Sequence, residues 1–210
     1  MKNLKKTRTN HLKTLLTAAI LALFLPAGLL GQDPSPEEIA KWRELYAKLA
    51  QPGPEHKMLE KMAGRWDQEI RMWPQPGAES MVMKGSIESK LVLGGRFLQA
   101  HSFMNGSKDV VAISFLGFDR RNGTYTTIGM DTMGTYWVTG AGPPGAPGEP
   151  IVMPGSDHDS SLGATQIYDF VVRWINDDTY VWEIIFKDKV HTRGTGEPFK
   201  MVEITARRRQ

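Results

Sequence analysis

Apolar and polar residues alternate along most of the chain after residue 64, as they do in β-strands that bury one face. Groups rich in Gly, Pro, Asn and Asp separate the alternating runs and predict turns between them. The predicted strands are residues 66–73, 80–92, 96–104, 110–119, 124–131, 135–139, 151–153, 165–176, 179–187 and 199–208. No helical pattern interrupts this series, so the sequence favours an all-β domain.

The phase of the alternation predicts which side chains face the core. In residues 168–174, for example, the aromatic residues share one face with Val172, and Asp169 and Arg173 share the other. The predicted inward residues are Trp66, Ile70, Met72, Met81, Met83, Ile87, Tyr168, Phe170, Trp174, Tyr180, Trp182 and Phe186. In the strand 96–104 we expect His101 to face inward together with Phe97, Gln99 and Phe103.

Strands that follow one another through short turns favour an up-and-down meander, and closing it into a barrel removes its exposed edges. We therefore predict one antiparallel barrel of about 8–10 strands, with a two-sheet sandwich as the alternative. Residues 140–164 are rich in Gly and Pro. Apart from the short strand 151–153, they are expected to form a mobile loop at one end of the barrel.

The first 31 residues contain no acid. Five cations lie between residues 2 and 13, and the apolar run 15–25 and then Pro26-Ala27-Gly28 follow them. This order is typical of a secretory signal peptide. The apolar run is shorter than the roughly 20 residues that a membrane-spanning helix needs, so a retained anchor is the less favoured interpretation. We expect the mature protein to be periplasmic or secreted.

An amphipathic helix is predicted within residues 32–55, before the barrel. Ser35 is a suitable N-cap, Pro36 suits the first turn, and Glu38 completes a capping box. The apolar face of this helix comprises Ile39, Trp42, Leu45, Tyr46 and Leu49. We expect it to pack against the main body as a helical spacer, the alternative being a membrane-surface or partner helix.

Charge and cysteine content narrow the range of partners. Without the leader's five cations, residues 32–210 have a net charge of −2, and Arg207-Arg208-Arg209 is the only dense basic run. Nucleic acid is therefore not an expected partner. The chain has no cysteine, so it has neither a disulfide framework nor a lipid-modified residue to hold it at a membrane after cleavage. The oligomeric state is not indicated.

Gly64-Arg65-Trp66, at the start of the first predicted strand, resembles the Gly-x-Trp signature of lipocalins and related calycin barrels. The resemblance implies that Trp66 lies across the closed floor of the barrel, under a basic residue from the last strand. A guanidinium can stack on an indole while donating hydrogen bonds to nearby carbonyls. Because Val202, Ile204 and Ala206 form the apolar face of the last strand, Arg208 is preferred to Arg207 as this partner.

The chain also resembles the bacterial family known as domain of unknown function 1579, which is thought to adopt such a barrel. The motifs that carry the resemblance, over about residues 56–208, are His56-Lys57-Met58-Leu59, Ala63-Gly64-Arg65-Trp66, Leu93-Gly94-Gly95-Arg96-Phe97-Leu98, Gly117-Phe118-Asp119, Asp131 with Gly134-Thr135, and Glu203-Ile204-Thr205-Ala206-Arg207-Arg208. Gly129 and Ala206 stand where that family usually has an aromatic residue. The implied organisation is a signal peptide (1–31), a helix and linker (32–55) and a lipocalin-like barrel (56–210).

Motifs for catalysis or metal binding are sparse. The sequence has no Cys nucleophile, no Gly-x-Ser-x-Gly elbow and no His-Glu-x-x-His helix, so no catalytic residues are assigned. Asp157-His158-Asp159 is interpreted as a solvated turn, and no metal site is predicted. No cofactor is expected, although haem ligation through His101 or His191 is the alternative to an ordinary imidazole role.

The inward residues either fill the barrel or line a cavity for a small hydrophobic molecule. The candidate ligand-binding residues are Met72, Met83, Ile87, Arg96, His101, Tyr168, Phe170 and Trp182, with Trp66 and Arg208 forming the floor. Arg96 is expected to pair with Asp119 or Asp131, or to bind an anionic group. Two alternatives remain: an isomerase or hydrolase that uses Arg96 with Asp131, and a solid structural barrel that acts through its N-terminal helix or the 140–164 loop.

Overall fold

The computed structural model describes residues 34–210, so the predicted signal peptide lies outside the described residues. The chain divides into two compact units, Met1–Tyr46 and Ala47–Gln210. Helix α2 (Pro36–Leu49) begins with the predicted capping box: the Glu38 amide donates to Ser35 Oγ at 3.3 Å, and the Ser35 amide donates to Glu38 Oε2 at 2.8 Å. No residue of α2 is buried, and its packing against the main body stays a prediction.

The second unit is a barrel of ten antiparallel strands, which confirms the all-β prediction. A short helix, α3 (His56–Met62), precedes the strands. The strands are β1 (Gly64–Met72), β2 (Met81–Val92), β3 (Phe97–Met104), β4 (Val110–Asp119), β5 (Thr124–Asp131), β6 (Val138–Gly142), β7 (Ile151–Asp159), β8 (Ala164–Asn176), β9 (Thr179–Phe186) and β10 (Phe199–Arg208). Their order in the sheet is β6-β5-β4-β3-β2-β1-β10-β9-β8-β7.

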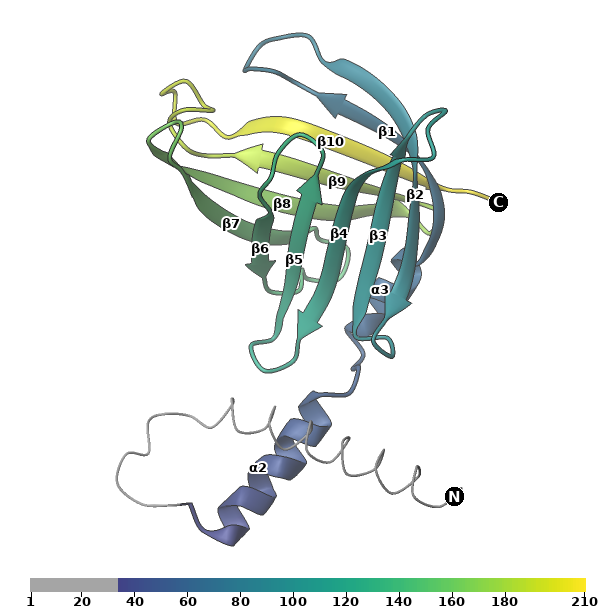
Figure 1. Cartoon of the computed structure of the whole chain (residues 1–210), viewed down its shortest axis with the longest axis vertical. Helices are drawn as coiled ribbons and strands as arrows, with labels where there is room; N and C mark the ends of the chain where they lie inside the picture. The colour runs from purple at the N-terminus through teal and green to yellow at the C-terminus, as the bar shows by residue number, and fades with distance from the viewer. Residues whose placement is uncertain (1–33) are drawn as a thin grey trace, which may run out of the picture. The chain divides into compact units, whose positions relative to one another are not determined.

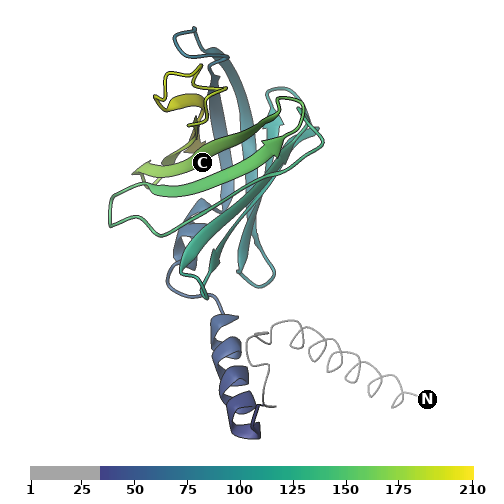
Figure 2. The same cartoon turned by 90° about the vertical axis from the view of Figure 1, so that its left-hand side faces the viewer.

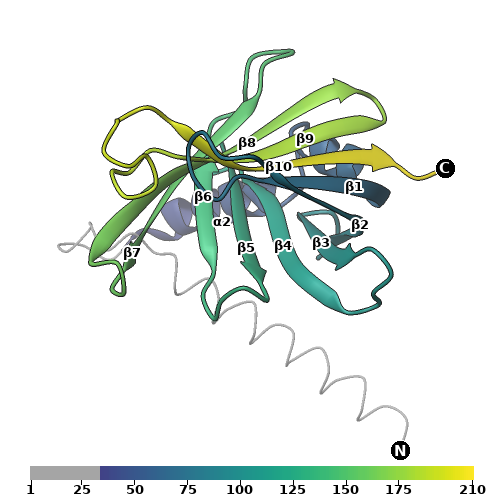
Figure 3. The same ribbon diagram turned by 90° about the horizontal axis from the view of Figure 1, so that it is seen from above.

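The sheet consists of two meanders, β1 to β6 and β7 to β10, joined where β1 pairs with β10. Its edge strands β6 and β7 lie side by side (Figures 1 and 3), although no ladder pairs them within the described part of the chain. Glycines permit this approach, because a Cβ on Gly142 would collide with the carbonyl oxygen of Val152. The barrel is therefore nearly closed, with a packed seam between β6 and β7.

The prediction of a loop over residues 140–164 was wrong. β6 extends to Gly142 and β7 runs from Ile151 to Asp159, so the loops are only residues 143–150 and the turn 160–163. Three of the glycines that suggested a loop, Gly140, Gly142 and Gly155, are small enough for the close packing of the seam. Pro154 lies in an edge strand, where a missing N–H is tolerated. Asp157-His158-Asp159 consequently belongs to β7 and not to a turn.

Helix α3 and the start of β1 close one end of the barrel, called the floor below (Figure 2). Trp66 is fully buried, and the Arg208 guanidinium carbon lies 4.1 Å from the centroid of its ring. Arg208 Nη1 donates to the Ala63 carbonyl at 3.1 Å and Nη2 to the Lys61 carbonyl at 2.6 Å, while Arg207 is exposed. Tyr125 secures the helix from β5, because its hydroxyl donates to the Glu55 carbonyl at 2.8 Å.

The predicted phase of β3 was also wrong. Leu98, Ala100 and Ser102 line the barrel interior, so His101 points to the outer face with Phe97. Both faces of this strand carry apolar residues, and the face with the larger side chains was assigned to the core. The structure instead places the smaller side chains inside, opposite the aromatic residues of β8 and β9.

Candidate functional site

A cavity of about 180 Å³ lies inside the barrel above the floor. Its lining comes from α3 and eight of the ten strands. The lining residues are Met62, Ile87, Ser89, Leu98, Ala100, Ser102, Ala112, Ile113, Ser114, Leu116, Thr127, Gly129, Met130, Asp131, Val138, Phe170, Tyr180, Trp182, Ile184 and Ile204. Met130 and Asp131 are exposed, so the cavity extends to the end of the barrel opposite the floor, called the open end below.

The two sides of the cavity differ in chemistry. Strands β2 to β5 contribute mainly small and hydroxyl-bearing residues, whereas β8 to β10 contribute large apolar and aromatic residues. The first wall includes Ser89, Ala100, Ser102, Ala112, Ser114, Thr127 and Gly129. The second wall consists of Phe170, Tyr180, Trp182, Ile184 and Ile204. The cavity can therefore contact an apolar body on one side and hydrogen-bond to a polar edge on the other.

Two hydroxyls of the first wall are already occupied by the protein. Ser89 Oγ donates to the Met62 carbonyl at 2.6 Å, and Thr127 Oγ1 donates to the Phe115 carbonyl at 3.2 Å. Within residues 34–210, by contrast, neither Ser102 Oγ nor Ser114 Oγ has a hydrogen-bond partner. These two hydroxyls from adjacent strands can each donate one hydrogen bond and accept others from a bound molecule.

Tyr180 adds a phenol to the second wall. Burial disfavours its phenolate and raises the pKa of Tyr180 above its ordinary value. The phenol therefore stays neutral at any physiological pH. Its ring meets Trp66 edge-on with centroids 4.9 Å apart, so the floor fixes the orientation of the cavity wall.

The structure brings only some of the predicted ligand-binding residues to the cavity. Ile87, Phe170 and Trp182 line it. Tyr168 is buried beside Phe170, with ring centroids 5.3 Å apart, but it is not part of the lining. Met72 and Met83 belong to the inward faces of β1 and β2, also outside the lining.

Arg96 lies away from the cavity, at the turn between β2 and β3. Its guanidinium donates to the Ala50 carbonyl at 2.7 Å and to the Leu93 carbonyl at 2.9 Å. It pairs with neither of the predicted acids, since Arg121 and Asn122 bind Asp119 and lower the pKa of that carboxyl to about 2. Arg96 precedes β3 and Asp131 ends β5, so the two residues lie at opposite ends of the barrel. The pair on which the enzyme alternative depended is therefore not formed.

The two histidines proposed as haem ligands are also outside the cavity. His101 is on the outer face, and His191 is in the β9–β10 loop, where its Nδ1 lies 2.9 Å from Asp188 Oδ2. Burial raises the pKa of Asp188, but hydrogen bonds from the His191 amide and imidazole outweigh it and keep the pKa below its ordinary value. Among the residues the structure describes, no cluster of three potential metal ligands exists.

Sequence reasoning missed the hydroxyl wall. Ser102, Ser114 and Gly129 are small residues at inward positions of three neighbouring strands. The only sequence signal for this wall was in β3, where Leu98, Ala100 and Ser102 alternate with larger residues. A search for large hydrophobic residues overlooks a cavity, because the residues that create space are small.

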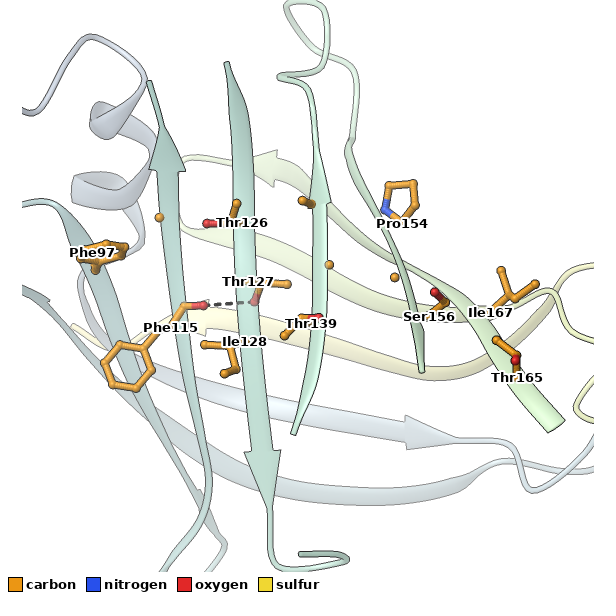
Figure 4. A pocket seen from close by; sticks show the side chains of 14 residues that line it. Phe97, Phe115, Thr126, Thr127, Ile128, Thr139, Pro154, Ser156, Thr165 and Ile167 are labelled. Carbon is orange, nitrogen blue, oxygen red and sulfur yellow. Dashed lines mark hydrogen bonds between the residues drawn. The ribbon is translucent and has the colours of Figure 1, made fainter. Parts of the chain in front are cut away.

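A second hollow, of about 770 Å³, lies on the outer face of strands β3 to β8, across the seam (Figure 4). Outward side chains such as Phe97, Phe115, Ile128 and Ile167 line it, and it is wide open to solvent. Because an open hollow removes little ligand surface from water, the interior cavity is the better candidate for a small-molecule site. Within residues 34–210, no helix combines the length and apolar character needed to cross a membrane.

Fold and site together define the class of protein: a ten-stranded antiparallel β-barrel with a plugged floor and a small two-sided cavity. Residues 51–208 match the family described as "Protein of unknown function (DUF1579)", and the chain belongs to that family. This match confirms the resemblance seen in the sequence motifs. No curated protein matches the chain.

Solved structures similar to the chain include other β-barrel and uncharacterised proteins. One is a redesigned β-barrel with 9% identity and a TM-score of 0.31, covering 72% of this chain and 95% of that one. Another is a protein of unknown function from the DUF3598 family of Nostoc punctiforme PCC 73102, with 8% identity and a TM-score of 0.24, covering 75% of this chain and all of the other.

Proposed function

We propose that this barrel binds a small, largely hydrophobic molecule with one hydrogen-bonding edge. The two-sided cavity carries the proposal, because its aromatic wall faces a wall with the free hydroxyls of Ser102 and Ser114. An apolar group would lie against Phe170, Trp182 and Ile184, and a polar edge would lie toward the serines. As part of the same proposal, signal cleavage leaves this binding barrel in the periplasm or outside the cell.

The size of the cavity limits the occupant. An apolar cavity of about 150 Å³ in another protein accommodates benzene, and the cavity here is of similar size at about 180 Å³. The proposed ligand class is therefore a single aromatic ring or a short alkyl chain that carries a hydroxyl or carbonyl group. A long-chain lipid or a porphyrin would not fit without rearrangement of the walls.

Gly129 provides a direct test of the cavity. A Cβ at this position would meet only Val138 Cγ2, at 3.8 Å, and otherwise enters open space. Gly129→Leu is expected to fill the cavity with little strain and to weaken the binding of phenol and hexan-1-ol at least about tenfold in calorimetric titrations. Thr126→Leu is the matched control, because it adds a leucine to the outer face of the same strand.

Selective loss of binding in the Gly129 variant would support the proposal. Equal binding by both variants would show that the probes bind elsewhere and would contradict it. Binding of benzene as tightly as phenol, with no effect of Ser102→Ala, would show that the hydroxyl wall does not contribute.

A further inference from the structure

Large hydrophobic side chains are exposed mainly at the open end of the barrel. Antiparallel topology places the β1–β2, β3–β4, β5–β6, β7–β8 and β9–β10 connections at this end, opposite α3. Figure 2 shows the β1–β2 connection at the top and α3 at the bottom of the barrel. The exposed residues at or next to these connections are Met81, Val82, Val110, Met130, Met133, Tyr136, Trp137, Leu162, Ile167 and Val190.

The β5–β6 loop is the most apolar of these connections. Met133, Tyr136 and Trp137 are 76%, 65% and 66% exposed, and residues 132–137 include no charged residue. The β7–β8 turn, residues 160–163, is also uncharged and exposes Leu162. Solvent-facing clusters of this kind are uncommon on soluble monomers and mark interaction surfaces.

The chemistry of this cluster favours a lipid surface over a folded protein partner. Trp and Tyr prefer the boundary between headgroups and acyl chains, because each has an apolar ring and a polar group. The apolar tips come from separate loops around a cavity mouth, and a fluid surface can accommodate tips of unequal height. The charged residues in or beside the open-end connections are of mixed sign, which suits zwitterionic headgroups; they include Lys108, Lys189 and Arg193 together with Asp109, Asp131, Asp159 and Glu197.

We propose that the open-end rim, defined as Met133, Tyr136, Trp137, Leu162 and Val190, docks on the surface of a lipid bilayer. The tips of the β5–β6 and β7–β8 connections enter the interfacial layer, and the mouth of the cavity faces the lipid. Because Met130 and Asp131 are both exposed and part of the cavity lining, the docked mouth is continuous with the cavity. Docking requires no ligand in the cavity and is independent of the proposed binding function.

The absence of cysteine makes a site-specific test possible with the full chain. Met133→Cys and Leu93→Cys each introduce one thiol, at positions that are 76% and 72% exposed but lie at opposite ends of the barrel. Each thiol is labelled with an environment-sensitive fluorophore. The labelled proteins are mixed with phosphatidylcholine vesicles that carry a nitroxide quencher in the upper acyl chain.

The label at position 133 is expected to shift to shorter wavelength and to be quenched by the nitroxide, whereas the label at position 93 should do neither. This comparison reports which end enters the lipid, even if another part of the full chain also binds vesicles. Adding Tyr136→Ser and Trp137→Ser to the Met133→Cys protein should weaken its affinity for the vesicles, measured by titrating the shift with lipid, at least about tenfold, or about 1.4 kcal/mol.

Three results would overturn the proposal. The label at position 133 could remain unaffected by vesicles, or both labels could respond equally. Alternatively, the shift at position 133 could appear without vesicles and grow with protein concentration, which would identify the rim as a contact between copies of the chain.

Discussion

Arg208 connects three parts of the floor through one side chain. The last carbonyl groups of a helix have no partners within it, and the Arg208 guanidinium donates hydrogen bonds to the carbonyls of Lys61 and Ala63. The Met62 carbonyl between them accepts hydrogen bonds from Trp66 Nε1 at 3.0 Å and from Ser89 Oγ. Side chains from three strands thus complete the C-terminal end of α3 and fix it to the barrel.

Replacing Arg208 should therefore destabilise the whole barrel. Arg208→Ala removes three charge-assisted hydrogen bonds, two to carbonyls and one to Asp178 Oδ1, together with the stacking on Trp66. The expected cost is about 2–4 kcal/mol in the free energy of unfolding. Arg208→Lys should recover only part of this, because an ammonium lacks the planar fork. Urea denaturation followed by tryptophan fluorescence measures both changes.

Arg207→Ala is the matched control for this prediction. Arg207 is exposed and one residue away, so its replacement should change the free energy of unfolding by no more than about 0.5 kcal/mol. Similar losses for the two alanine variants would contradict the assigned role of Arg208.

At the scale of whole strands, the packing of β6 against β7 depends on small residues. Gly142→Ala would place a methyl group against the Val152 carbonyl oxygen, and the backbone of β7 cannot move easily because β8 pairs with it along its length. We expect a loss of about 2 kcal/mol or more in the free energy of unfolding. Thermal and urea denaturation of the variant provide the measurement.

Gly129→Ala, on the neighbouring strand, is the comparison for the seam. Its new methyl group enters the cavity without a clash, so the variant should be neutral or up to about 1 kcal/mol more stable. If Gly129→Ala were as destabilising as Gly142→Ala, loss of glycine alone would explain both results. The close packing at the seam would then not be the cause of the lower stability.

Most elements of the barrel follow from alternation alone. β4, β5 and β10 have the predicted bounds, and six boundaries of β1, β2, β3, β8 and β9 shift by one or two residues because turns begin slightly earlier or later than residue types suggest. β6 was placed three residues too early and β7 was ended six residues too soon, because Gly and Pro disfavour strands locally, whereas packing at the seam requires the glycines and an edge strand tolerates Pro154. Local preference and tertiary packing conflict there, and packing determines the structure.

The site was less accessible to sequence analysis than the fold. Aromatic wall residues such as Phe170 and Trp182 are conspicuous in the sequence. Ser102 and Ser114 can be recognised as site residues only once the structure shows that they share a cavity with these aromatic residues. Arg96 seemed available for a ligand because its partners, the carbonyls of Ala50 and Leu93, are backbone groups that no sequence motif reveals.

For the molecule as a whole, His56 links stability to pH. Burial, aided by Arg120, lowers the pKa of this imidazole, against an opposing effect of Glu55. An unfolded chain has a histidine pKa of about 6.5 and binds the proton more tightly than the folded protein does. His56 therefore contributes fully above this pH, and its contribution falls as the pH decreases toward the lower folded value.

We expect the free energy of unfolding to be nearly constant from about pH 7 to 8 and to decrease between about pH 6.5 and 5. His56→Gln should reduce this slope, whereas His158→Gln should leave it unchanged because His158 is exposed. Urea denaturation at several pH values tests this, and an unaltered slope in His56→Gln would assign the effect to other groups.

The pairing of β1 with β10 also determines when the barrel can be completed. Pairs within each meander join residues that are close in the chain, whereas Trp66 pairs with Arg208 near the opposite end. Contacts between such distant residues form slowly, because a long loop must be closed first. During synthesis the barrel stays open until β10, the strand Phe199–Arg208, has left the ribosome. Until then, an exported chain could still pass through a translocation pore, because its barrel is not yet closed.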